Sequence, residues 1–334
     1  MPRVGCAFKP DLWVMIRTVF FGTPDFAATC LKALIADPTI EVCAVVTAPD
    51  RPSGRGLALH PSAVAVCASE HGLPVLRPER LRDEGFLAEL RAIQADVFTV
   101  VAFRMLPEVV WSMPRLGSLN IHASLLPDLR GAAPIQWSLA YGDRETGLTA
   151  FSLNAHIDEG PLLAQVGVSI APNETLGQLY PRMAEEGAGL AVRVLGDLAH
   201  GSITGRPQSA DDEWRLAPKL GPEFARLELL SSAFLVHNRI RACDPAPGAS
   251  LPNPERPEER FKLFRSEYLP SATEGQSVNP FYVIDNEGFI IKDAQGELRI
   301  HEIQWPGKRR MPVADFLRGT RIRGRFTLSG QKID

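Results

Sequence analysis

Two spacings of apolar residues alternate through the first two hundred positions of the chain. Residues 18–21 form a largely apolar run that ends at Gly22, which is typical of a buried strand. Phe26, Cys30 and Leu34 then recur every four positions, and this spacing places them on one face of a helix. This part of the chain therefore predicts a strand followed by an amphipathic helix.

The alternation of strand and helix patterns continues downstream. The patterns predict strands over 42–47, 97–102 and 118–122, and helices over 87–93 and 175–198. Residues 50–56 interrupt this order, and their composition predicts a mobile, basic loop. Strands that alternate with helices favour an α/β fold of the Rossmann-like class, with a mainly parallel sheet covered by helices.

The pattern changes after residue 200. Residues 201–222 are polar and punctuated by proline and glycine, as in a linker. Beyond them, short strand patterns such as 288–291 and 298–303 predict a smaller β-barrel domain, which we expect to be OB-like. The expected organisation is a disordered extension or misplaced start codon at 1–14, a Rossmann-like catalytic domain at 15–205, a linker at 206–222 and a β-rich domain at 223–330.

Composition and charge narrow the classes of function. The formal charge of -3 over 334 residues argues against a generally basic nucleic-acid-binding protein, but it leaves room for a local basic face. The five cysteines are scattered without a C-x-x-C pair, which favours a reducing cytoplasm and predicts neither a disulfide framework nor a zinc site. No apolar run approaches the roughly 20 residues of a membrane helix. We therefore expect a cytoplasmic protein that does not bind membranes.

The densest candidate chemistry lies in residues 119–137, which read LNIHASLLPDLRGAAPIQW. Asn120 and His122 are two positions apart on a predicted strand, so both side chains point to the same face. They lie at the carboxyl end of that strand, where open α/β sheets bind their ligands. An amide beside an imidazole suits acyl transfer, because the amide stabilises an oxyanion and the imidazole handles the proton. Taken alone, the pair is also explained by a turn-capping asparagine and a structural histidine.

A carboxylate that can accompany His122 follows at Asp158, within the sequence IDEGP. We expect Asp158 to lie on a tight turn and to pair with His122. A carboxylate beside an imidazole fixes its orientation and favours its charged form. An aspartate that only closes an Asx turn is the alternative explanation of the same residue.

Basic residues concentrate near the carboxyl terminus. Residues 306–332 contain eight lysines and arginines and a single acid, Asp315. Arg321, Arg323 and Arg325 alternate, so on a strand they would line one face. Such a face would neutralise the phosphates of a nucleic acid, whereas a solvated charged terminus is the simpler alternative.

A long ordered motif carries a resemblance to a known family. The sequence N-x-H-x-S-L-L-P-x-x-R-G-A-A-P-I-x-W, followed by I-D-x-G, resembles the formyltransferase family that uses 10-formyltetrahydrofolate. The resemblance spans nearly all of residues 15–330. Further segments resemble the methionyl-tRNA branch of that family in particular: VFFGTPDF at 19–26, DRPSGRG at 50–56, APKL at 217–220, IRA at 240–242 and PGA at 247–249.

The resemblance implies an enzyme that transfers the formyl group of 10-formyltetrahydrofolate to the α-amine of initiator methionyl-tRNA. The product, N-formylmethionyl-tRNA, serves translation initiation. Asn120, His122 and Asp158 would be catalytic, with no metal and no protein partner implied. The folate would contact Ser124, Leu125, Leu126, Pro127, Phe103, Arg104 and Leu106. Together with the basic terminus, the resemblance predicts tRNA contacts at Arg51, Arg55, Lys308, Arg309, Arg310, Arg321 and Arg323.

The implied mechanism is direct transfer. The methionyl amine attacks the formyl carbon, and Asn120 with a protonated His122 holds the oxyanion of the tetrahedral intermediate. Asp158 keeps His122 charged and assists proton movement. Positioned acid and base groups of this kind typically contribute about 10²–10⁴-fold to the rate.

Several other functions compete with this interpretation. The nearest is a formyltransferase acting on a sugar-nucleotide or glycinamide ribonucleotide amine, or a hydrolase of the formylated folate, and the second domain disfavours both. A nucleotide-dependent oxidoreductase would need G-x-G-x-x-G, which Gly22 does not begin. A metal hydrolase built from His122, His156 and Asp158 lacks a metal-binding signature. A pure RNA-binding protein on a decayed enzyme scaffold would not need the intact catalytic set.

Overall fold

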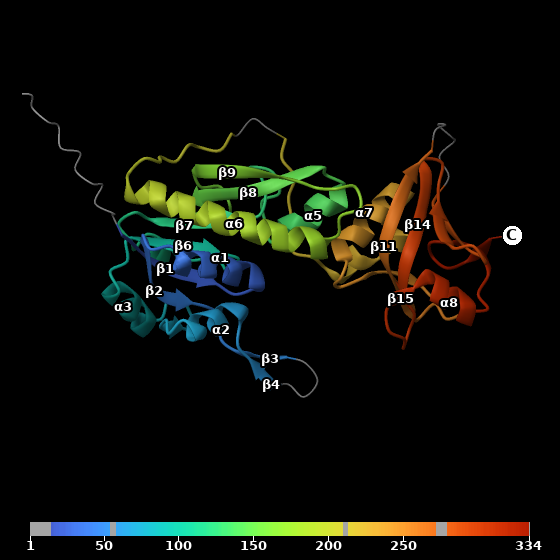
Figure 1. The fold of residues 1–334 in the computed structure, drawn as a ribbon, viewed down its shortest axis with the longest axis horizontal. Coiled ribbons are helices and arrows are strands. Elements are labelled where there is room, and N and C mark those ends of the chain that lie inside the picture. Colours follow the sequence, from blue (N-terminus) through green and yellow to red (C-terminus); the bar gives the residue numbers. More distant parts are fainter. Residues whose placement is uncertain (1–14, 54–57, 210–212, 272–278, 334) are drawn as a thin grey trace, which may run out of the picture. The chain divides into compact units, whose positions relative to one another are not determined.

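The computed structural model describes residues 15–53, 58–209, 213–271 and 279–333 (Figure 1). The predicted extension at 1–14 lies outside the described residues. Contacts between Cα atoms divide the chain into two units. The first comprises the described parts of Met1–His122, Thr149–Gln165 and Ala184–Gln208, and the second those of Ala123–Leu148, Val166–Met183 and Ser209–Asp334.

A seven-stranded sheet has the order β5-β2-β1-β6-β7-β8-β9. Neighbouring strands pair in parallel from β5 to β7, and β8 runs antiparallel to β7. The predicted α/β fold with a mainly parallel sheet is confirmed. The strands are β1 (Ile16–Gly22), β2 (Ile40–Val46), β5 (Val75–Leu76), β6 (Val97–Val101), β7 (Ser118–His122), β8 (Glu145–Ser152) and β9 (Leu162–Ser169).

Helices alternate with these strands, as the apolar periodicity predicts. In α1 the predicted face of Phe26, Cys30 and Leu34 is buried. The helix predicted over 87–93 begins earlier, because the Asp83 side chain accepts a hydrogen bond from the amide of Phe86 and caps the helix. The helices of this part of the chain are α1 (Asp25–Ala36), α2 (Ala63–Glu70), α3 (Glu84–Ala92), α4 (Glu108–Trp111), α5 (Pro134–Tyr141) and α6 (Leu176–Ala199).

The prediction of a loop over 50–56 is wrong for residues 51–53. β3 (Arg51–Ser53) pairs antiparallel with β4 (Ala58–His60), so these residues form the arms of a hairpin. Residues 54–57 lie outside the described residues. Strands of three residues are too short to show an alternating pattern, and this one contains a proline and adjoins two glycines, so the local sequence favoured a loop.

The carboxyl-terminal strands form a curled antiparallel sheet in the order β10-β11-β14-β13-β12-β16-β17, with β15 paired to β14. This half-barrel is consistent with the predicted OB-like fold. Figure 1 shows β11 and β14 side by side along most of their length. The strands are β10 (Ala249–Pro252), β11 (Arg260–Pro270), β12 (Phe281–Ile284), β13 (Phe289–Lys292), β14 (Gly296–Gln304), β15 (Met311–Pro312), β16 (Gly324–Thr327) and β17 (Lys332–Ile333).

Aromatic rings fill the interior of this curled sheet. Phe261 stacks on Trp305 with ring centroids 4.9 Å apart, and Tyr282 stacks on Phe326 at 5.1 Å. α7 (Ala233–Cys243) packs on β11, and α8 (Val313–Gly319) packs on β14. The short strands of this sheet therefore curl around a single aromatic core.

No helix among the described residues is long and apolar enough to cross a membrane.

Candidate active site

β7 presents the first two candidate catalytic residues. Asn120 lies opposite Val100 of β6 and Phe151 of β8, and His122 lies opposite Thr149 of β8. His122 is 6% exposed, while Asn120 is partly exposed. The predicted strand over 118–122 is therefore present with its predicted bounds, and it ends on the histidine.

Asp158 reaches His122 from a turn that follows β8. The Nδ1 atom of His122 lies 3.8 Å from Oδ2 of Asp158, with side-chain exposures of 7% and 13%. This distance allows an ion pair but exceeds the length of a direct hydrogen bond. The structure thus brings together two groups that are separated by 36 positions in the sequence.

The turn that carries Asp158 is held in a strained shape. Asp158 has a φ of 56°, in the left-handed region, which aspartate tolerates better than most residues. The side-chain amide of Gln208 donates to the carbonyl oxygens of Asp158 and Gly160, at 2.8 and 2.9 Å. A Cβ atom on Gly160 would overlap the carbonyl oxygen of Ser152, so glycine is required there. These contacts hold the carboxylate of Asp158 in place.

Asn120 contributes a buried acceptor. Among the residues that the structure describes, its Oδ1 atom has no hydrogen-bond partner and is buried. Leaving such a group unsatisfied costs about 1–3 kcal/mol, and native proteins satisfy nearly all of them. An unsatisfied amide beside an imidazole and a carboxylate is therefore a candidate contact for a ligand.

The three groups together can bind and polarise a carbonyl-like substrate. The Asn120 amide offers both a donor and an acceptor, the His122 imidazole can carry a proton, and the Asp158 carboxylate lies within ion-pair distance of that imidazole. No group of three or more His, Cys, Asp or Glu side chains in the described part of the chain is placed to hold a metal ion. The arrangement is suited to acid–base and oxyanion chemistry.

The residues after β7 form a tight turn. The Ser124 hydroxyl is fully buried and donates to the carbonyl oxygen of Asp128 at 2.6 Å. Leu126 is also buried, and its peptide bond to Pro127 is cis. Leu125 and Pro127 are partly exposed, so they are the members of the predicted folate-binding set 124–127 that are open to solvent.

The second predicted folate-binding segment follows β6. Phe103 packs against Phe21 at 5.7 Å between ring centroids, and Leu106 is buried in the same hydrophobic cluster. The exposed Arg104 donates to the carbonyl oxygens of Pro78 and Glu79. Phe103 and Leu106 therefore serve the core of the first unit, and Arg104 fixes a neighbouring loop.

The predicted basic face on the last strands is not formed as expected. β16 begins at Gly324, so Arg321 and Arg323 precede it and do not line a strand with Arg325. Gly324 has a φ of 135°, and Arg323 donates to the carbonyl oxygens of Leu317, Thr320 and Ile322. The chain turns here instead of extending, and the guanidinium of Arg323 stabilises the turn.

The other predicted tRNA-contact residues differ in exposure. Lys308 and Arg309 are exposed on the connection between β14 and β15, whereas Arg310 is held by Asp244 and Glu302 and lies over the ring of Phe264. Arg321 is exposed. Arg51 begins β3, and Arg55 lies outside the described residues.

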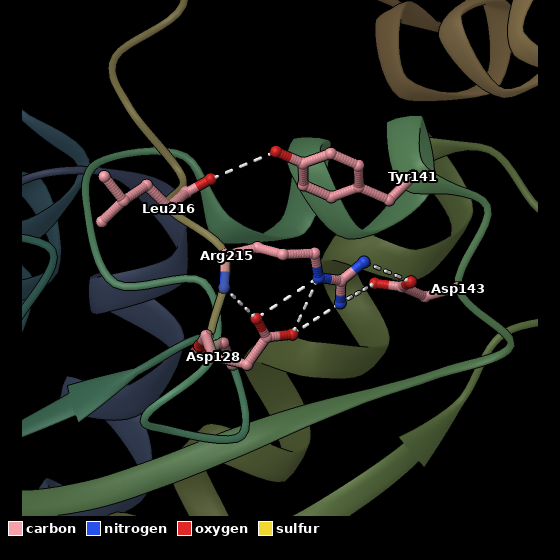
Figure 2. A network of polar contacts seen from close by, with 6 residues as sticks. Asp128, Tyr141, Asp143, Arg215 and Leu216 are labelled. Carbon is pink, nitrogen blue, oxygen red and sulfur yellow. Dashed lines mark hydrogen bonds and ion pairs between the residues drawn. The ribbon is translucent and has the colours of Figure 1, made fainter. Parts of the chain in front are cut away.

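Sequence reasoning missed Gln208 and an arginine-centred network in the second unit. Arg215 donates to the carboxylates of Asp128 and Asp143, and its guanidinium lies 4.7 Å from the ring centre of Tyr141 (Figure 2). Gln208 and Arg215 both belong to the predicted linker, and the polar composition of that segment gave no indication of their contacts. The available signals were Trp214 beside Arg215 and the adjoining segment APKL at 217–220, and neither indicated a contact with residues 128–133.

Fold and site define a group-transferring enzyme of the α/β class with a β-rich appendage. The chain belongs to the formyl transferase family: the model of that family matches residues 16–195, and the model of its carboxyl-terminal domain matches residues 219–321. The family resemblance carried by the sequence motifs is thereby confirmed. The chain is 38% identical over 320 residues to the methionyl-tRNA formyltransferase of Bacteroides fragilis, covering 94% of this chain and 98% of that protein. It is 41% identical over 307 residues to that of Alcanivorax borkumensis, covering 91% of each.

A solved structure shows the same fold at much lower identity. The N-formyltransferase of Helicobacter canadensis, in complex with folinic acid and dTDP-3-aminofucose, superposes with a TM-score of 0.60 at 17% identity. The match covers 86% of this chain and 99% of that one. At this identity the likeness supports the fold alone.

Proposed function

We propose that this protein transfers the formyl group of 10-formyltetrahydrofolate to the α-amine of initiator methionyl-tRNA. The observation that carries the chemistry is the ion-pair contact of Asp158 with His122 at the end of β7, two positions after Asn120 with its buried, unsatisfied amide oxygen. Support for the acceptor comes from relatives of that activity, which match both domains in order over more than nine tenths of the chain.

Each member of the set has a role that its surroundings support. The Asn120 amide donates to the oxyanion that forms when the amine attacks the formyl carbon, and its unsatisfied oxygen can accept an N–H of the attacking amine. His122, buried and next to a carboxylate, provides a second donor to the oxyanion. When the intermediate collapses, the bond between the formyl carbon and the folate nitrogen breaks, and the imidazole gives a proton to that leaving nitrogen and takes one from the attacking amine. Asp158 stabilises the charged imidazole and fixes its ring.

The folate co-substrate fits the chemistry of the donor set. A formyl oxygen is the kind of acceptor that an amide and an imidazolium bind, and an orphaned amide oxygen lies beside them. We assign folate binding to Ser124, Leu125, Leu126 and Pro127, because this turn continues directly from His122. The assignment extends to Phe103, Arg104 and Leu106 through their place after β6. When bound, the folate supplies the activated formyl group.

The proposal divides the work between two parts of the chain. Residues 15–205 would perform the chemistry, and residues 223–330 would bind tRNA, joined by 206–222. The exposed Lys308, Arg309 and Arg321 are suited to phosphate contacts, as is a hairpin whose first residue is Arg51. Arg310 and Arg323 are engaged by the protein, so their role in tRNA binding would be indirect.

The acceptor can be tested on the full chain. Formyl transfer from 10-formyltetrahydrofolate is measured to charged initiator methionyl-tRNA and, in parallel, to a dTDP-linked amino sugar and to glycinamide ribonucleotide. We expect turnover only with the tRNA, and its loss in His122→Ala. Turnover on either small amine with none on the tRNA would replace the proposed acceptor while leaving the catalytic set in place.

A further inference from the structure

The turn assigned to folate binding is closed by a segment that lies more than eighty positions further along the chain. Leu129 donates its amide to the carbonyl oxygen of Arg215 at 2.7 Å, and Ala217 donates to that of Arg130 at 2.8 Å. Ala133 in turn donates to the carbonyl oxygen of Ala217. The segment 214–218 therefore runs beside residues 129–133 like an added short strand.

One arginine fastens this segment to the turn. The backbone amide of Arg215 donates to Oδ1 of Asp128 at 2.7 Å, and its guanidinium also binds that carboxylate (Figure 2). The other edge of the guanidinium forms a bidentate pair with Asp143, at 2.8 and 3.0 Å. The ring of Tyr141 packs against the guanidinium plane. One planar cation thus fixes a carboxylate on each side, which a lysine cannot do.

Asp128 links this network to the folate turn. Its carboxylate accepts hydrogen bonds from Arg215, while its carbonyl oxygen accepts one from the buried Ser124 hydroxyl at 2.6 Å. The Asp128 amide donates to the carbonyl oxygen of Leu125. Residues 124–128 are therefore a closed loop whose last member is held from outside by Arg215.

Charge explains why the arginine is needed. Burial on its own would raise the pKa of Asp128, but hydrogen bonds from Arg215 lower it below its ordinary value. The two carboxylates also raise the pKa of Arg215 above its ordinary value. Without the guanidinium, the carboxylates of Asp128 and Asp143 would face the same point as two uncompensated negative charges and would repel each other.

The exposure of the Arg215 and Asp128 side chains determines whether their pairing contributes to global stability or to the local shape of the turn. The side chains of Arg215 and Asp128 are 41% and 35% exposed, so solvent screens their attraction and little global stability depends on it. The geometric effect is not screened, because the hydrogen bonds fix the shape of the turn. A turn held in its bound shape before the ligand arrives binds that ligand more tightly.

We propose that Arg215 is a positioning residue for the folate co-substrate, acting through Asp128 on the turn 124–128. The inference rests on the proposed function, since that function assigns the turn to folate. It predicts that folate affinity depends on a residue of the linker that touches neither substrate.

The test compares variants of the full-length chain. Binding of the stable analogue 5-formyltetrahydrofolate is measured by titration calorimetry, and KM and kcat are measured for both substrates. We expect Arg215→Ala to raise the Kd and KM for folate roughly 10-fold through misplacement of the turn, with kcat and the KM for tRNA within about two-fold. Arg215→Lys should recover part of the affinity, because it restores the charge but not the bidentate geometry.

A matched control separates this role from a general effect of the linker. Arg206 is an exposed arginine of the same segment that contacts Gln165 and none of the residues of the network. Arg206→Ala should keep wild-type folate affinity. In an Arg215→Ala background, Asp143→Asn should restore part of the affinity by removing one repelling charge.

The outcomes distinguish the inference from the function on which it rests. Equal folate affinity in wild type and Arg215→Ala overturns the inference alone. A loss in Arg215→Ala that appears equally in kcat, in both KM values and in the melting temperature overturns it too, since that result means a merely structural role. Absence of folate binding by the wild-type chain overturns the proposed function and the inference together.

Discussion

The His122 cluster and the Arg215 network are both built from side chains that are distant in the sequence, but they differ in the hydrogen bonding of one polar group each, the Asn120 amide oxygen and the Arg215 guanidinium. At β7, the imidazole and carboxylate stand 3.8 Å apart and an amide oxygen is buried without a partner among the described residues. Around Arg215, hydrogen bonds of 2.5–3.3 Å join the guanidinium and backbone to two carboxylates.

The difference separates groups that await a substrate from groups that support the fold. Unsatisfied hydrogen-bonding capacity reduces stability, so a protein retains it where a ligand will use it. Satisfied charges hold backbone segments in place and have little left to offer a substrate. The comparison predicts that changes at the first cluster reduce kcat without unfolding the protein. Changes at satisfied groups should instead alter ligand affinity or stability through the shape of the backbone and leave kcat nearly unchanged.

The largest effect is expected at His122. His122→Ala should lower kcat by about 10²–10⁴-fold, because it removes the proton-carrying group. Single-turnover formyl transfer gives the rate, and the melting temperature should change little. A variant that retains more than a tenth of wild-type kcat would place the essential proton transfer elsewhere.

Asn120 offers the sharper test of the comparison. Asn120→Ala should lower kcat about 10²–10³-fold through loss of the oxyanion donor. The same change removes a buried unsatisfied oxygen, so the melting temperature should stay constant or rise. Activity and thermal unfolding are measured on the same preparation. A clear fall in melting temperature would mean that the amide is structural and would break the contrast between the two regions.

A satisfied histidine should show the opposite behaviour. His237 is 2% exposed, and its Nε2 atom donates to the carbonyl oxygen of Pro172. Its Nδ1 atom lies 2.9 Å from the Ser266 hydroxyl, which can donate to the bare nitrogen of the neutral ring. Burial lowers its pKa from 6.5 to about 4. The unfolded chain therefore binds this proton at higher pH, and stability is lost as pH falls from 6.5 toward 4, by on the order of 3 kcal/mol.

The measurement for His237 is chemical denaturation at several pH values. In His237→Gln, whose side chain can keep both hydrogen bonds without titrating, this part of the acid sensitivity should disappear. If the stability difference between the two proteins stays constant from pH 7 to pH 4.5, the histidine does not titrate on unfolding as proposed.

The smallest effects are expected among the basic residues of the β-rich part. Arg310→Met should destabilise the protein by about 1–2 kcal/mol, because it leaves Asp244 buried without that partner.

Arg309→Met should leave stability unchanged and reduce the salt dependence of tRNA binding by just under one unit of slope. Denaturant unfolding and tRNA binding at several salt concentrations separate the two. Equal effects of both variants on tRNA affinity would show that Arg310 also contacts RNA.

The spacing of apolar residues along the chain was sufficient to predict much of the fold. Apolar periodicity located β7 to the residue and the buried face of α1, because these elements bury a regular set of side chains. It could not locate the hairpin of β3 and β4, whose strands are too short for a pattern. It also placed Arg321 and Arg323 on a strand, because alternation alone does not reveal the turn at Gly324.

The candidate site was only partly accessible from the sequence. Asn120 and His122 follow from strand geometry, and the pairing of Asp158 with His122 was expected from their chemistry. Gln208 and Arg215 were not, because nothing local connects a linker residue to a turn far upstream. Long-range hydrogen bonds of irregular segments have no periodic signature, so only the structure reveals them. The catalytic and folate-binding roles themselves stay predictions.

The pairing of residues 214–218 with 129–133 has a consequence for how this protein can be recombined with its relatives. Boundaries drawn from the family models would permit a chimera spliced anywhere between residues 195 and 219. Yet Arg215 and Ala217 bind the residues that follow β7, so a splice before residue 214 would pair these residues with a 214–218 segment from a different parent. A chimera that keeps its function must take both segments from the same parent. Residues 129–133 and 214–218 therefore have to be exchanged as one unit, although they are far apart in the sequence.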